Sequence, residues 1–421
     1  MEREKYDSYV QILRHELVPA LGCTEPIAIA YAGAIARQVL GRLPERVHVA
    51  CSGNIIKNVK AVYVPNSGGK KGVEVAAMLG IIGGDPKREL AVLESVREEH
   101  RVQVEEFLKT GNCTVSLIAG DDNLHIIMEL FSGDDCSLVE IKGTHQHVIR
   151  IERNGEETFA QSEFSSTKID KSMLNLRDIV TFADEVCLED VQDIIQRQIA
   201  YNCAICAEGL ANPYGAQIGR LLMSRNSGDI QVRAKATAAA GSDARMNGCT
   251  MPVVINSGSG NQGITVCVPV VEYAQYLNSS EEKLCRALVL SNLAALLQKR
   301  NIGSLSAFCG AVCAAAGAGC GIAYLEDQPF EVIAMAISNT LAIVGGIVCD
   351  GAKASCAGKI AESLDAAILG YSMAREGIAF QPGEGLVKSD VEKTILSVGR
   401  MGRIGMAPTD IEILNIMLEQ N

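Results

Sequence analysis

Short runs of alternating hydrophobic and polar residues lie between residues 113 and 153. Alternation with a period of two is typical of β-strands that have one buried face. Segments rich in Gly, Asp, Asn and Thr separate the runs and favour turns. The pattern predicts an antiparallel meander whose strands cover residues 114–118, 125–131, 137–141 and 147–153.

The segment before this meander mixes helical and strand patterns. Apolar residues with helical spacing predict helices over residues 7–15, 27–40, 73–82 and 88–108. Residues 46–51 and 61–65 have the composition of strands, and residues 53–58 indicate a short connector.

Beyond residue 164 the apolar spacing becomes helical. Helices are predicted over residues 176–185, 191–209, 264–277, 332–347, 360–375 and 409–418, and two glycine-rich regions, residues 235–249 and 256–263, interrupt them. We therefore expect an α+β protein with two domains. A small α/β domain with antiparallel strands covers residues 1–165, and a mainly helical catalytic domain covers residues 166–421.

Two uncharged segments, residues 304–325 and 332–349, are long enough to span a bilayer. The first consists mostly of Ala, Gly, Ser and Cys, which insert weakly, and no basic loop joins the two segments. We interpret both as buried helices of the helical domain.

Charge and composition narrow the class of protein. The formal net charge is -12 and the pI is about 5.1, which argues against a surface for nucleic acids or anionic membranes. Charged residues rather than an apolar run follow Met1, so we expect no signal peptide and a cytoplasmic protein. In that compartment the 15 cysteines are expected to be free, metal-bound or catalytic rather than bridged.

Residues 302–359 concentrate the candidate chemistry. Cys309 and Cys349 lie close to glycines, in small-residue segments on either side of a predicted apolar helix. Thiolates beside such open backbone indicate a soft metal or an iron–sulfur cluster. The alternative is a tightly packed helical core in which cysteine serves as a small hydrophobic residue. The residue pattern leaves both interpretations open.

A third thiolate could come from Cys23 or from Cys356. Pro26 suits the first turn of a helix and Thr24 suits its N-cap, which places Cys23 at a helix N-terminus. Anions are favoured there, and the pKa of a thiol is lowered. Three thiolates would leave one iron of a cubane cluster open to act as a Lewis acid.

The remaining cysteine and histidine motifs give weaker indications of a functional site. Cys203 and Cys206 have CxxC spacing inside a helical pattern, and without a second such pair we interpret them as core residues. All six histidines lie at or before His147, which excludes a Ser-His-Asp triad or a His-rich zinc site within the helical domain. His145 and His147 are expected in a solvated turn.

Residues 256–263 form a glycine-rich segment before a predicted helix. Such backbone can hold a carboxylate or a phosphate. Neither a P-loop nor a dinucleotide-binding fingerprint fits the segment. The alternative is a loop that only packs between helices.

Four separated motifs carry a resemblance that covers nearly the whole chain. They are Ala-Leu-Gly-Cys-Thr-Glu-Pro at residues 20–26, Ser-Asp-Ala-Arg-Met at 242–246, Asn-Ser-Gly-Ser-Gly-Asn-Gln-Gly at 256–263 and Val-Cys-Asp-Gly at 348–351. With these motifs the chain resembles the L-cysteine desulfidase family, described as serine dehydratase alpha-like. It resembles iron–sulfur L-serine dehydratase more distantly.

The resemblance implies a fold, a cofactor and an activity. A small α/β domain would precede a helical domain that holds a [4Fe-4S] cluster, with Cys23, Cys309 and Cys349 as ligands. In the dehydratases the third ligand follows the Cys-Asp pair more closely, near Cys356 here. The implied reaction is the α,β-elimination of L-cysteine to hydrogen sulfide, ammonia and pyruvate.

The residues offer partners for such a reaction. Lys57, Asp243 and Lys353 are candidate bases for the α-proton. The candidate substrate-binding residues are Thr24, Glu25, Asn256, Ser257, Asn261 and Gln262. The alternatives are an L-serine dehydratase on the same scaffold, a non-enzymatic protein that binds amino acids or metals, and a structural helical protein with inert cysteines. We expect a small amino-acid substrate, a homo-oligomer such as a dimer, and sensitivity to oxygen.

Overall fold

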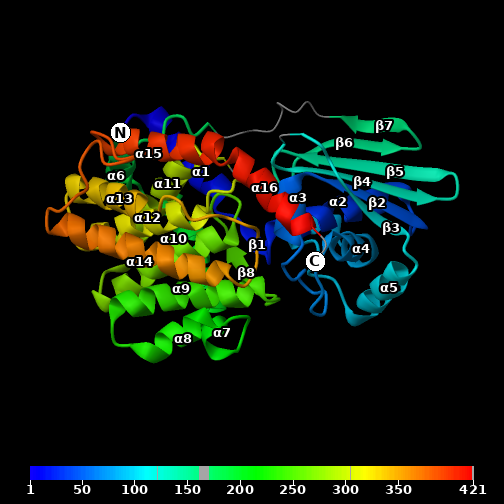
Figure 1. Cartoon of the computed structure of the whole chain (residues 1–421), viewed down its shortest axis with the longest axis horizontal. Coiled ribbons are helices and arrows are strands. Elements are labelled where there is room, and N and C mark those ends of the chain that lie inside the picture. Colours follow the sequence, from blue (N-terminus) through cyan, green and yellow to red (C-terminus); the bar gives the residue numbers. More distant parts are fainter. Residues whose placement is uncertain (121, 161–169, 304, 420–421) are drawn as a thin grey trace.

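The computed structural model of the protein describes residues 1–120, 122–160, 170–303 and 305–419. A six-stranded sheet with its covering helices forms one end of the molecule, and a body of helices forms the other (Figure 1). The predicted α+β class is confirmed.

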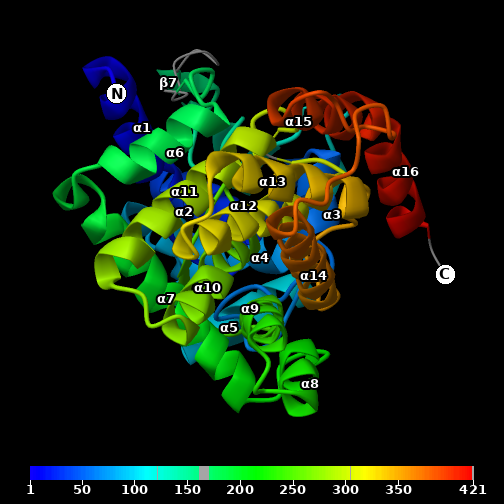
Figure 2. The ribbon, with the colours of Figure 1, turned by 90° about the vertical axis from the view of Figure 1, so that its left-hand side faces the viewer.

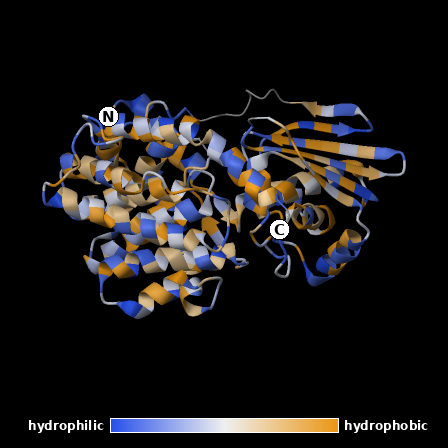
Figure 3. Cartoon of the chain, in the orientation of Figure 1, coloured by the Kyte–Doolittle hydropathy of each residue, from blue (hydrophilic) through white to orange (hydrophobic). Residues whose placement is uncertain are grey.

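The large sheet has the strand order β3-β2-β4-β5-β6-β7. Its strands are β2 (Arg46–Cys51), β3 (Cys113–Leu117), β4 (His125–Ser132), β5 (Asp135–Lys142), β6 (Val148–Arg153) and β7 (Glu156–Ala160). Buried and partly exposed positions alternate along most of β4 and β5. Figure 3 shows hydrophobic and hydrophilic residues mixed along the strands of this sheet. The predicted meander is correct from β4 onward, but β3 pairs with β2 in parallel. A helical crossover before β3 allows that direction.

Four helices accompany the sheet. They are α2 (Thr24–Leu40), α3 (Gly53–Val59), α4 (Val73–Gly83) and α5 (Glu98–Lys109). The connector predicted over residues 53–58 is wrong, because these residues form α3. The strand predicted over residues 61–65 is also wrong, because only an isolated bridge between Tyr63 and Lys71 forms there. The single helix predicted over residues 88–108 is interrupted, because Glu89 has a φ of 49° and kinks a 3₁₀ segment, Pro86–Ala91, and α5 begins only at Glu98.

The remaining helices build the second part of the molecule. They are α1 (Arg3–Glu16), α6 (Leu176–Glu185), α7 (Gln192–Ala211), α8 (Ile218–Arg225), α9 (Ile230–Met246), α10 (Gly260–Tyr276), α11 (Glu281–Lys299), α12 (Gly310–Leu325), α13 (Phe330–Val344), α14 (Cys356–Arg375), α15 (Val391–Arg400) and α16 (Ala407–Leu418). Helix α12 is almost entirely buried and packs against α10, α11, α13 and α14 (Figure 2). Its small residues permit this close packing.

The glycine-rich region predicted over residues 235–249 is largely the helix α9, which packs against α7, α8 and α14. Its run of Ala and Gly therefore serves helix contact rather than an open loop. Among the described residues, no helix combines the length and the apolar character that crossing a membrane requires.

The first helix of the chain lies on the helical body. Tyr6 and Tyr9 of α1 contact the ring of Phe182 in α6, each with a centroid distance of 5.3 Å. The chain then passes through β1 (Pro19–Leu21), which pairs with β8 (Pro252–Val254), and enters the α/β part. The domain boundary predicted near residue 165 lies outside the described residues, so the two-domain division stays a prediction.

Candidate functional site

A cavity of about 110 Å³ lies where residues of the α/β part meet the helical body. Four cysteines from separate segments line it, namely Cys23, Cys309, Cys349 and Cys356. The volume is below the roughly 300 Å³ at which pockets for drug-sized ligands begin, so the cavity suits a compact group rather than a nucleotide.

Backbone pairing places Cys309 beside Cys349. The amide of Cys309 donates to the carbonyl of Ile347 at 3.0 Å, and the amide of Cys349 donates to the carbonyl of Ala307 at 2.7 Å. The Cys309 thiol donates a hydrogen bond to the Cys349 sulfur, which lowers the pKa of Cys349 and raises the pKa of Cys309. The charges of Lys57 and Lys299 lower the pKa of Cys349 further.

The loop before α2 brings Cys23 to the same cavity. Gly22 has a φ of 63° and approaches Pro65 so closely that a Cβ there would lie 2.2 Å from its Cγ, so this turn requires glycine. The Cys23 thiol donates to Glu25 Oε2 at 2.9 Å. Burial and then the charge of Glu25 raise the pKa of Cys23 well above its ordinary value. The sequence pattern predicted a helix N-terminus here, but its N-cap is Cys23 and not Thr24, and the shift of this pKa is opposite to the predicted one.

Four helices begin at this cavity. Cys23 is the N-cap of α2, Cys309 is the N-cap of α12, Cys356 is the first residue of α14, and Ser259 is the N-cap of α10. The N-terminus of a helix carries a partial positive charge and unpaired amides. The convergence of four such ends favours negative charge inside the cavity.

Cationic side chains add to this field. Arg245 joins two cavity segments, because Nη2 donates to the Gly22 carbonyl at 2.7 Å and Nη1 donates to Asn261 Oδ1 at 3.2 Å. Lys359 pairs with Asp350. Lys299 is 5% exposed and lines the cavity, and its ammonium makes no hydrogen bond or ion pair within the described ranges. Burial lowers the pKa of Lys299.

One histidine of the α/β part reaches the cavity. His145, in the connection between β5 and β6, lines the cavity, and its Nε2 is shielded from solvent without a partner in the described part of the chain. Its Cε1 would lie 3.5 Å from a Cβ placed on Gly258 of the helical body. The expectation of a solvated turn is wrong for His145. Burial lowers the pKa of His145.

Five of the six candidate substrate-binding residues line the cavity, namely Thr24, Glu25, Ser257, Asn261 and Gln262. Gln262 lies against Gly310, where a Cβ would come within 2.4 Å of its Cδ, so glycine at this position makes room for the amide. Asn256 is fully buried and donates to Asn292 Oδ1 at 3.0 Å, which makes it part of the helical core.

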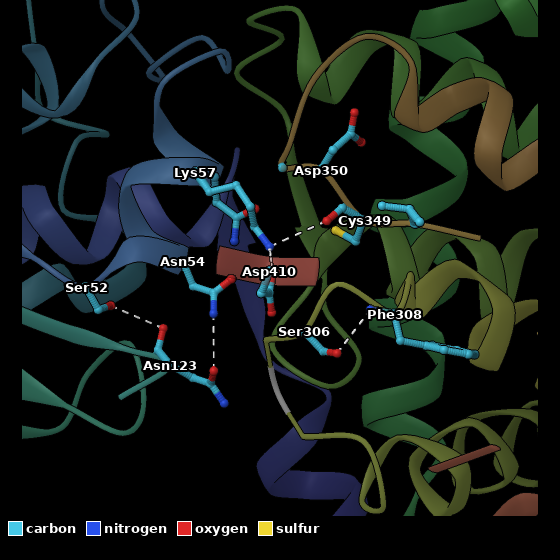
Figure 4. Close-up of polar contacts among 12 residues, drawn as sticks. Ser52, Asn54, Lys57, Asn123, Ser306, Phe308, Cys349, Asp350 and Asp410 are labelled. Atoms are coloured by element: carbon cyan, nitrogen blue, oxygen red, sulfur yellow. Dashed lines mark hydrogen bonds and ion pairs between the residues drawn. The ribbon is translucent and has the colours of Figure 1, made fainter. Parts of the chain in front are cut away.

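The candidate bases Lys57 and Lys353 are occupied by other contacts. Lys57 is 2% exposed, pairs with Asp410 of α16, and lies 3.5 Å from the carbonyl oxygen of Cys349. Figure 4 shows the Lys57 ammonium between these two partners. Lys353 pairs with Asp350 at 2.6 Å. Neither lysine is among the described cavity-lining residues.

The candidate base Asp243 lies away from the cavity lining. Its Oδ2 accepts a hydrogen bond from the amide of Gly219 at 2.9 Å, at the start of α8. Burial raises the pKa of Asp243 to about 6. This carboxyl therefore connects α9 to α8.

His145, for which we expected a solvated turn, lines the cavity instead. The only signal for His145 in the sequence was its place in the segment His-Gln-His, which is typical of an ordinary turn.

No group of three or more His, Cys, Asp or Glu side chains in the described ranges is arranged to hold a metal ion. The thiolates of a cubane cluster bind different irons, so they lie farther apart than the ligands of a single ion. Cys203 and Cys206, interpreted as core residues, lie on α7 and are absent from the described lining of the cavity.

Comparison with known proteins identifies the family. Residues 87–415 match the family described as serine dehydratase alpha chain. A UPF0597 protein of Desulfitobacterium hafniense is 49% identical over 100% of this chain and 99% of its own length. A UPF0597 protein of Lachnoclostridium phytofermentans is 50% identical over 98% of this chain and 100% of its own length. A UPF0597 protein of Treponema denticola is 44% identical over 100% of this chain and 99% of its own length. The family description indicates lyase-type chemistry. This chain belongs to the serine dehydratase alpha chain family.

Proposed function

We propose that this protein is an iron–sulfur lyase that removes the β-substituent of a small α-amino acid, with L-cysteine as the substrate. The observation that carries the proposal is the meeting of Cys23, Cys309, Cys349 and Cys356 at one cavity. Thiols that only fill a core need not gather from separate segments around a space lined by helix N-termini.

The donor set fits a thiolate-bound cluster. Cys309 and Cys349 are adjacent, and Cys23 or Cys356 would complete a set of three. The helix N-termini and the cations Lys299 and Arg245 offset the negative charge that such a group brings. A [4Fe-4S] cluster with three protein ligands supplies one Lewis-acidic iron to a substrate.

The residues around the cavity supply the remaining chemistry. Neutral His145 takes the α-proton through Nε2, which has no other partner among the described residues. The C–S bond then breaks, its electron pair leaves with sulfur, and aminoacrylate remains, which hydrolyses to pyruvate and ammonia. Burial keeps the pKa of His145 below its ordinary value, so the imidazole is neutral at pH 7.

The substrate's own charges have matching partners. Asn261 and Gln262, at the N-terminus of α10, suit the carboxylate. Glu25 is the carboxylate among the described lining residues and suits the ammonium. A small amino acid is therefore the substrate class that the cavity fits best.

L-Serine dehydration is the second candidate, and the family description favours it. Both reactions yield pyruvate and ammonia, but only L-cysteine yields sulfide. The test is to load the protein with iron and sulfide anaerobically and to assay pyruvate and sulfide with L-cysteine, L-serine and L-threonine. Sulfide release with the highest kcat/KM for L-cysteine supports the proposal. A loaded protein that eliminates none of these amino acids would refute it.

A further inference from the structure

Lys299 lies in the cavity wall, and its ammonium has no ion-pair partner among the described residues. The side chain comes from the last residue of α11, and the residue is 5% exposed. The ionisable groups that interact electrostatically with this ammonium are the thiols of Cys313, Cys349 and Cys309 and the carboxyl of Asp410. A charge buried without a partner is strongly unfavourable, so a negative group bound in the cavity would stabilise the charged form of Lys299.

The carboxylates nearby are already committed to other partners. Asp410 pairs with Lys57. Asp350 pairs with Lys353 and Lys359.

Glu25, which also lines the cavity, accepts hydrogen bonds from Cys23, Thr24 and Asn58. Arg245, a second buried cation of the cavity, hydrogen-bonds to neutral partners and has no ion pair within the described ranges either. The charged lining therefore carries a surplus of positive charge.

We infer that Lys299 is the counter-charge of the group bound by Cys309 and Cys349, and that it sets the reduction potential and the retention of that group. This inference rests on the cluster proposed above. Lys299 acts through the bound group, so it is a positioning residue rather than a catalytic one. A positive charge beside a cluster stabilises its reduced, more negative state and strengthens the binding of anionic thiolates.

The charge-removing variant is Lys299→Met, which keeps most of the length of the side chain. Lys299→Arg keeps the charge. Lys283→Met is the matched control, because Lys283 lies on the same helix and pairs with Asp327 near the surface. Each protein is prepared anaerobically, loaded with iron and sulfide, and compared by midpoint potential and by the rate of cluster loss to a chelator.

We expect Lys299→Met to have a more negative midpoint potential and to lose its cluster several-fold faster, while Lys299→Arg and Lys283→Met stay close to the wild type. In the metal-free protein the same variant should melt at a higher temperature than the wild type, because the unpaired charge is gone. This second measurement also shows that the variant folds.

Three results would overturn the inference. The first is a loaded Lys299→Met protein with the potential and the chelation rate of the wild type. The second is a Lys299→Arg protein shifted as far as the methionine variant, since charge would then not be the cause. The third is a metal-free methionine variant that melts below the wild type. A wild-type chain that takes up no cluster would instead refute the proposed function.

Discussion

The thiol of Cys309 donates a hydrogen bond to the sulfur of Cys349, although the two residues come from opposite ends of the α12–α13 hairpin. The bridge between Phe308 and Val348 holds the two segments together. The hydrogen bond from Cys309 stabilises the thiolate form of Cys349, and the charges of Lys57 and Lys299 stabilise it further. A thiolate is the form of cysteine that binds metals. This pair is the centre of the candidate site.

Cys309→Ala and Cys349→Ala should each abolish stable iron loading, because either change removes one of two adjacent ligands. Iron and acid-labile sulfide per chain are the measurement. Cys320→Ala is the control, because Cys320 is buried on α12 and is absent from the described cavity lining. Full loading of either variant would exclude that thiol as a ligand.

Cys23 and Cys356 give a direct comparison of the two candidates for the third ligand. We expect Cys23→Ser to lose the cluster and Cys356→Ser to keep it, as the family resemblance implies. The visible absorbance of anaerobically loaded protein measures this. The reverse outcome would assign the ligand to Cys356 and leave Cys23 as a hydrogen-bond donor to Glu25.

His145→Gln should lower kcat by about 10²–10⁴-fold while iron content is unchanged, because a positioned base contributes that much. Exchange of the substrate's α-proton in deuterated water should fall in parallel. His147→Gln is the control, since His147 Nδ1 contacts the Lys142 carbonyl at 2.9 Å and His147 is absent from the described lining. An unchanged kcat in the His145 variant would remove it as the base.

The pH dependence of kcat/KM should report the same histidine. Burial lowers the pKa of His145 from its ordinary 6.5, and the charge of Glu25 opposes that shift only in part. The base is active when deprotonated, so activity should rise with pH through a pKa below 6.5 and reach a plateau before neutrality. Loss of this acid limb in His145→Gln checks the assignment. A limb that persists unchanged belongs to another group.

Lys57 and Asp410 join the two parts of the molecule through α3 and α16. Lys57→Met or Asp410→Asn alone should lower the free energy of unfolding by about 3–5 kcal/mol, because each leaves a largely buried charge unpaired. The double variant should recover much of that loss, as measured by denaturant unfolding. Additive losses in the double variant would show that the pair is not coupled.

Air should inactivate the loaded enzyme, and iron with sulfide under reducing conditions should restore it, because an iron without a protein ligand is open to oxygen. L-Cysteine should slow the loss by occupying the site. Sulfide release and visible absorbance are followed together during exposure to air. Undiminished activity after the cluster absorbance has gone would contradict the mechanism.

Local patterns in the sequence predicted most of the elements. The helix expected over residues 176–185 matches α6, and the period-two runs match β4 to β6. The errors lie where tertiary packing overrides local composition. The small residues of α9 indicated a glycine-rich region, but they form a helix that packs against neighbouring helices. Residues 53–58 indicated a connector, but they form α3, which packs against α16.

The sequence by itself determined the α+β class and most of the cavity's chemical groups, because cysteines beside glycines and N-caps before apolar runs are local signals. Only the tertiary structure decided which groups share the cavity. It brings His145 from a hairpin of the sheet to Gly258, pairs Lys57 with Asp410, and leaves Lys299 beside Cys309 and Cys349. These contacts are between residues that lie far apart along the chain. The local periodicity of hydrophobic residues predicts helices and strands, but it does not predict which distant side chains come into contact.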